Sequence, residues 1–150
     1  MAMEIDYDRY ADGESRLGWL NASVRAASAA PSDGNALLEE FAADLHGRLS
    51  ARSIAVAHLK MTLHAGDSMA SINLVRNDFV SELGVRLDAP LAAATITVNL
   101  RGESAPAVLQ EALTESLGKR GDWRLDLEHV EAFRPGRPVP THRDAMPSST

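Results

Sequence analysis

The sequence predicts a single α+β domain in which one βαβ unit occurs twice. Residues 19–64 and 95–134 each contain a strand with an arginine near its end, then a helix, then a strand that carries a histidine. One βαβ unit cannot bury its sheet face and its helix face alone, so the two copies are expected to share one sheet. At 150 residues the chain is long enough for one domain with a substantial core.

The first copy shows the periodicities of a strand and of a helix. Apolar residues alternate with polar ones from Trp19 to Ser28, which is typical of a half-buried strand. In the helix that follows, leucines and Phe41 fall on one apolar stripe. We expect a strand at 19–28, a turn at 31–34 and a helix at 33–49. A second strand is expected at 53–63, followed by a hairpin turn at 64–67 and a returning strand at 68–78.

The second copy begins after residues 78–92, which show no clean period and are expected to form a long connection or a short helix with a loop. A strand, a helix and a last strand follow at 94–102, 104–120 and 123–133. Gly118 or Gly121 is expected to close this helix, and the last strand should bulge near Glu128 and His129, where the alternation slips. The whole order predicts a ferredoxin-like split-βαβ two-layer sandwich, built from two βαβ repeats with an added strand.

Composition divides the chain into three segments. Residues 1–18 form an acidic leader in which a short helix is expected, residues 19–134 form the domain, and residues 135–150 form a tail rich in proline and arginine. The helices are expected to cover one face of the sheet. The other face is either open or a partner surface, and carries Ser23, Arg25, His58, Lys60, Thr62, Asn99, Arg101 and His129.

Charge and motifs argue against several classes of function. The formal net charge is −6, and the expected open face lacks a Phe or Tyr pair on its central strands, so no nucleic-acid partner is expected. No GxxxxGK[ST] or GxGxxG loop is present, which argues against NTP hydrolysis by this chain. Cysteines, a secretory leader and an apolar run of roughly 20 residues are absent, so we expect a cytoplasmic protein with no membrane partner.

The arginines are the main candidates for binding. Arg25 and Arg101 hold matched positions in the repeat and are expected to converge on an anionic ligand or on carboxylates of a partner. Solvated strand residues that guard an exposed face are the alternative. The tail FRPGRPVPTHR suits an acidic groove of another protein, or else latches back over its own domain. The candidate binding residues are Arg25, Asn99, Arg101, Lys60, Arg134 and Arg137.

Two histidines are candidate metal ligands. The repeat sets His58 opposite His129, and neutral imidazole is the commonest metal ligand in proteins, so a divalent metal ion is the cofactor considered. Glu128 or Glu131 would then supply a third ligand. No short chelating spacing such as HxH accompanies them, so two structural histidines are the alternative.

Four segments resemble the domain that follows the P-loop region in CobW/HypB/UreG-type GTPase proteins. They are DYDRYADGESRLGWLNASV, AHLKMTL, INLVRND and FRPGRPVPTHR, and the resemblance spans residues 4–143. It implies an accessory domain that contacts a P-loop GTPase or its client in metal or cofactor delivery. The GTPase motifs of that family are absent here, so none of its catalytic or nucleotide-binding residues carries over.

The preferred interpretation is therefore a non-enzymatic accessory domain that binds a protein partner. The alternative is a homodimer that binds a small ligand or metal and closes its open sheet face with apolar residues, namely Ile54, Val56, Ile72 and Leu74. A third hypothesis is a small enzyme that uses His58 or His129 as a general base.

Overall fold

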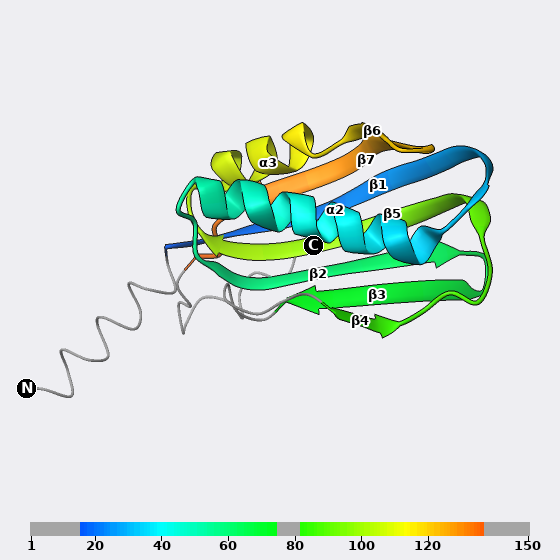
Figure 1. Cartoon of the computed structure of the whole chain (residues 1–150). Coiled ribbons are helices and arrows are strands. Elements are labelled where there is room, and N and C mark those ends of the chain that lie inside the picture. Colours follow the sequence, from blue (N-terminus) through cyan, green and yellow to red (C-terminus); the bar gives the residue numbers. More distant parts are fainter. Residues whose placement is uncertain (1–15, 75–81, 137–150) are drawn as a thin grey trace, which may run out of the picture.

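A computed structural model describes residues 16–74 and 82–136, which form an α+β fold with one seven-stranded antiparallel sheet and two helices (Figure 1). The elements are, in chain order, β1 Leu17–Ser32, α2 Gly34–Ala51, β2 Val56–Ala65, β3 Ser68–Leu74, β4 Glu82–Val85, β5 Leu91–Glu103, α3 Pro106–Glu115, β6 Gly118–Arg120 and β7 Trp123–Phe133. Neither helix in this part of the chain is long and apolar enough to cross a bilayer.

The strand order in the sheet is β4-β3-β2-β5-β1-β7-β6, and every neighbouring pair is antiparallel. The two longest strands, β1 and β5, pair side by side at the centre and set the register for the strands outside them. The β1–β5 ladder joins Ala22 to Val98, and β2 and β7 extend it on either side. Two short strands, β4 and β6, form the edges, which limits the unpaired backbone that the sheet exposes.

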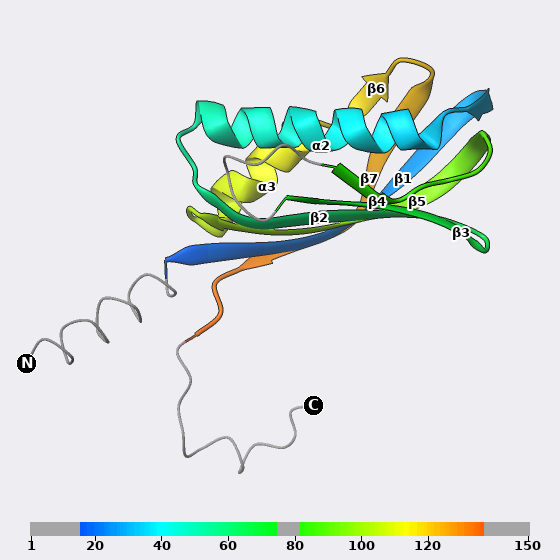
Figure 2. The ribbon, with the colours of Figure 1, turned by 60° about the horizontal axis from the view of Figure 1, so that its bottom comes forward.

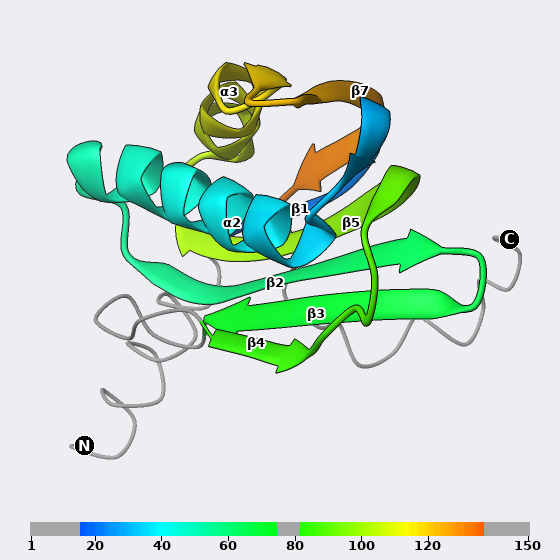
Figure 3. The ribbon, with the colours of Figure 1, turned by 45° about the vertical axis from the view of Figure 1, so that its right-hand side comes forward.

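Both helices lie on the same face of the sheet, and among the described residues no helix covers the opposite face (Figures 2 and 3). α2 packs against β2 and β3, and α3 packs against β7 and β1. The side chains between the helices and the sheet are mostly Leu, Val, Ile and Ala, with Phe41 of α2 fully buried among them. Period-two burial along each central strand therefore gives the sheet one apolar face and one polar face.

Local chemistry explains where the helices begin and end. The Asp33 side chain accepts a hydrogen bond from the Ala36 amide at 3.1 Å and so caps α2. Pro106 begins α3, where its missing N–H costs nothing. At the end of α3 the hydroxyl of buried Ser116 donates to the Leu113 carbonyl at 2.6 Å.

An ion-pair cluster joins the two helices and the β6 edge. The Arg52 guanidinium donates to both carboxylate oxygens of Glu115 at 2.8 Å, and this hydrogen bond lowers the pKa of Glu115. Asp44 of α2 accepts from Arg48 at 2.8 Å and also pairs with Arg120 of β6. The cluster fixes how α2, α3 and β6 meet, on the side of the molecule away from the open sheet face.

Several expectations from the sequence are confirmed. The hairpin turn lies at Gly66 and Asp67, between β2 and β3, and Gly66 has a φ of 62°. In β7 the register against β1 shifts so that Glu128 is the extra residue, which is the expected bulge.

Other expectations are wrong. Residues 82–85 form strand β4, where a connection or short helix was expected. The second helix ends at Glu115, and Gly118 and its neighbours form strand β6 instead of closing the helix. Gly118 has a φ of 102°, which turns the chain back toward β7 after α3.

The four apolar residues assigned to an open face in the homodimer hypothesis are instead core residues. Ile54, Val56, Ile72 and Leu74 are all buried beneath the helices. In β2 the register against β5 shifts between Val56 and His58, and this turns Val56 to the covered face. The hairpin register pairs Ile72 with the core residue Met61, so it has the same orientation.

The segment boundaries also differ from those expected. β1 begins at Leu17, so the end of the expected leader belongs to the sheet, while residues 1–15 lie outside the described residues. The tail is described only as far as residue 136.

Gly18 and Gly47 provide a matched test of the packing. A Cβ at Gly18 would lie 2.5 Å from the Ser104 carbonyl oxygen, whereas a Cβ at Gly47, on the exposed side of α2, meets nothing within 4 Å. We expect Gly18→Ala to lower the free energy of unfolding by about 1–3 kcal/mol. Gly47→Ala should raise it by about 0.5–1 kcal/mol, because alanine loses less backbone entropy in a helix. Urea unfolding of both variants measures these changes, and equal effects at the two positions would contradict the packing described.

Candidate functional site

The candidate site lies on the sheet face that has no helix over it, which we call the open face. Its side chains are those in the exposed phase of β2, β5, β1 and β7. Register pairs align them in rows that run across the four strands. Small polar side chains fill the middle of the face, at Thr62, Thr97 and Ser23.

One row, the arginine row, crosses the face near the start of β1. It consists of His58 on β2, Arg101 on β5, Trp19 on β1 and Phe133 on β7, which are consecutive register partners. The Arg101 guanidinium carbon lies 4.1 Å from the centre of the Trp19 ring, in a cation–π contact. The Trp19 and Phe133 rings are 5.9 Å apart at a tilt of 47°. Arg101, Trp19 and Phe133 therefore form a continuous stack that ends at Phe133, whose side chain is exposed.

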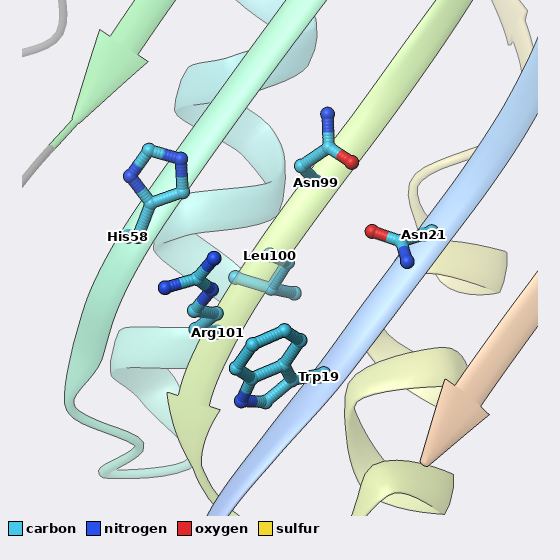
Figure 4. A pocket seen from close by; sticks show the side chains of 6 residues that line it. All are labelled: Trp19, Asn21, His58, Asn99, Leu100 and Arg101. Carbon is cyan, nitrogen blue, oxygen red and sulfur yellow. The ribbon is translucent and has the colours of Figure 1, made fainter. Parts of the chain in front are cut away.

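The next row toward the middle of the sheet, the amide row, consists of Lys60, Asn99, Asn21 and Glu131. A hollow of about 180 Å³ lies between the two rows and is lined by Trp19, Asn21, His58, Asn99, Leu100 and Arg101. Figure 4 shows Arg101 between the imidazole of His58 and the indole of Trp19, with Asn21 and Asn99 on adjacent strands beside them. The hollow thus combines hydrogen-bonding amides with a cation and an aromatic ring.

Charge is distributed unevenly over the open face. Within the described residues neither Arg101 nor Lys60 has an ion pair with a carboxylate. Burial lowers the pKa of His58 below its usual value, and the charges of Arg101 and Lys60 lower it further. His58 is therefore held in its neutral form near neutral pH, beside two cations that form no ion pair with a carboxylate of residues 16–74 or 82–136.

Arg25 has a different environment from Arg101. Arg101 pairs in register with Trp19 and Arg25 pairs with Thr95, six residues earlier on β5. At about 3.4 Å per residue the two arginines lie roughly 20 Å apart, so they do not converge on one ligand. The Arg25 guanidinium instead binds Glu128 at 2.8 Å.

The two candidate metal ligands are also far apart. His58 is on β2 and His129 is on β7, with β5 and β1 between them, so the two strands are separated by roughly 14 Å. His129 lies 3.6 Å from Glu131, and the described segments contain no group of three or more potential metal ligands. If the two histidines held equivalent positions in the repeat, each would pair in register with an arginine on the neighbouring strand. His58 on β2 does pair with Arg101, but the partner of Arg25 on β7 is Asp126 and not His129, so the expected match is wrong.

The other predicted residues divide between the site and the tail. Asn99 and Arg101 line the hollow, and Lys60 is the register partner of Asn99 on β2. Arg134 follows β7 and is exposed, and Arg137 lies outside the described residues.

The sequence analysis overlooked the aromatic part of the site. Trp19 falls in the same period-two phase as Asn21 and Arg25, which places it on the polar face, and this signal was available from the sequence. Phe133 reaches the same face only because the bulge at Glu128 changes the phase of β7. The open face therefore carries an aromatic pair, Trp and Phe, on the neighbouring strands β1 and β7.

Comparisons of the chain with models of protein families, with curated proteins and with solved structures find no match. The resemblance to the domain after the P-loop region in CobW/HypB/UreG-type GTPase proteins stays a prediction.

The lowered pKa of His58 predicts a specific dependence of stability on pH. The unfolded chain binds the proton of this histidine near its ordinary value of 6.5 and the folded chain binds it only at lower pH. Stability from this group is therefore fully present above pH 6.5 and is lost as pH falls toward the folded pKa. Imidazole NMR titration should show this pKa rising toward 6.5 in Arg101→Ala. An unchanged titration would mean that Arg101 does not act on His58.

Proposed function

We propose that this chain is a non-enzymatic binding domain that docks an acidic segment of a partner protein on its open face, at the arginine and amide rows. The observation that carries the proposal is the pair of uncompensated cations, Arg101 and Lys60, beside a half-exposed aromatic stack. A carboxylate from a partner supplies the charge that these cations lack, and it can bind the guanidinium through two hydrogen bonds.

The size of the hollow supports a side chain as its occupant. At about 180 Å³ it is smaller than the roughly 300–1,000 Å³ of sites that enclose drug-sized ligands. One carboxylate side chain fits such a space, with the amides of Asn21 and Asn99 as donors. Tryptophan and arginine are also the residues that most often dominate the energy of protein interfaces.

The strand arrangement supports a finer description of the fold as well. The central order β2-β5-β1-β7, with α2 between β1 and β2 and α3 between β5 and β7, supports a ferredoxin-like split-βαβ sandwich. In this description β3, β4 and β6 are additions at the two edges.

For the biological setting we propose metal or cofactor delivery, with a P-loop GTPase or its client as a further partner of the domain. The four segments that resemble the CobW/HypB/UreG-type proteins support this setting, and they include the start of β1 with Trp19. The tail with Arg134 and Arg137 provides a second, cationic contact. The separation of His58 from His129 favours protein binding over a shared metal site.

A short glutamate-rich peptide tests whether the site takes carboxylates. Binding should change the fluorescence of Trp19, which lines the hollow. The change can be assigned to Trp19 because Trp123, the second tryptophan, is buried in the core. Arg101→Ala should lower the affinity for the peptide by about tenfold or more, which is about 1.4 kcal/mol. Added salt should lower the affinity further.

Arg25→Ala is the matched control, because it removes an arginine from the same face that already pairs with Glu128. It should leave peptide affinity within about twofold. Equal losses in the two variants would refute the proposed site.

A further inference from the structure

The two outer strands of the open face carry side chains of complementary chemistry in the same rows. In the amide row Lys60 stands on β2 and Glu131 on β7, linked in register through Asn99 and Asn21. Both charged side chains are exposed. The β2 end of this row is therefore cationic and the β7 end anionic.

The same relation holds in two further rows. In the arginine row His58 and Arg101 lie on the β2 side, and the rings of Trp19 and Phe133 lie on the β7 side. In a third row, His64 of β2 aligns with Asp126 of β7 through the register pairs of Thr95 and Arg25. These three rows thus present basic or imidazole groups on β2 and acidic or aromatic groups on β7, and in the third row Arg25 on β1 is already paired with Glu128. The remaining row, Thr62, Thr97, Ser23 and His129, is polar and has its imidazole on β7.

A twofold axis converts this polarity into self-complementarity. Consider an axis parallel to the strands, in the plane of the interface and between β5 and β1. It places β2 of one copy over β7 of the other and keeps every row over the same row. Lys60 of each copy then faces Glu131 of the other copy, so the pair occurs twice. Arg101 of each copy faces the Trp19 ring of the other copy. This is the isologous arrangement of a C2 dimer.

The dimensions of the face also suit such a dimer. The four strands that the axis relates, β2, β5, β1 and β7, span roughly 19 Å across, and β2 is roughly 34 Å long. Their product is roughly 650 Å², which lies within the roughly 600–1,000 Å² that each partner buries in a stable interface of standard size. Small side chains in the middle of the face, such as Thr97 and Ser23, allow two sheets to approach to the usual spacing of about 10 Å.

From these observations we infer that the partner of the open face is a second copy of this chain, packed sheet to sheet about that axis. The inference rests on the proposed function and names its partner: the carboxylate that compensates Lys60 beside the hollow is Glu131 of the second copy. Stability of the dimer comes from the two symmetric Lys60–Glu131 pairs and from the arginine and aromatic contacts at one end of the face.

Charge reversal with rescue tests the inference on the full chain. Sedimentation and light scattering at micromolar concentration should give twice the chain mass of 16.1 kDa for the wild type. Lys60→Glu and Glu131→Lys should each weaken dimerisation at least tenfold, because each places like charges opposite one another. An equimolar mixture of the two variants should restore a dimer that contains one chain of each kind.

Glu40→Lys is the control, since it reverses an exposed charge on α2, on the opposite side of the molecule. It should leave the dimer unchanged, and circular dichroism should show that all three variants fold. A monomeric wild type, or a dimer that neither reversal weakens, would overturn the inference. The glutamate peptide distinguishes the two proposals, because a monomer that binds this peptide at Arg101 retains the proposed site with a different partner.

Discussion

The structure depends above all on the register between β1 and β5. This central antiparallel pair places Val24 and Ile96 under the helices, and it places Trp19 and Arg101 on the opposite face. Because side chains alternate with a period of two, a slip of one residue would exchange the two faces of a strand and expose the core. The same register aligns the rows of the open face, so the pairing of β1 with β5 determines both the core and the candidate site.

Two bulges adjust that register at the outer strands. In β2 the extra residue at Ala57 turns Val56 into the core while His58 stays on the open face. In β7 the extra residue at Glu128 has the corresponding effect, and it brings Phe133 against Trp19. Each bulge therefore allows one strand to serve the core along part of its length and still deliver an aromatic or imidazole side chain to the arginine row.

Electrostatics then distinguishes the two ends of the open face. Arg25 is neutralised by Glu128, so its end of the face presents a completed ion pair. At the other end Arg101 packs on an aromatic ring and Lys60 stands among amides, with no carboxylate bound to either in the part of the chain that the structure describes. An exposed pair contributes little to stability, whereas an uncompensated cation beside an aromatic ring is available for recognition.

The sequence by itself determined the α+β class, the two helices, the polar phase of the central strands and the bulge in β7, because each of these follows from local periodicity and turn chemistry. It also placed Lys60, Asn99 and Arg101 on one face. Only the tertiary structure decided which strands are neighbours, and hence that Arg101 meets Trp19 while Arg25 meets Glu128. Strand order and bulged register come from contacts between residues far apart in the chain. Local spacing carries no information on such contacts, and for this reason the two histidines could be aligned by pattern although β5 and β1 lie between their strands.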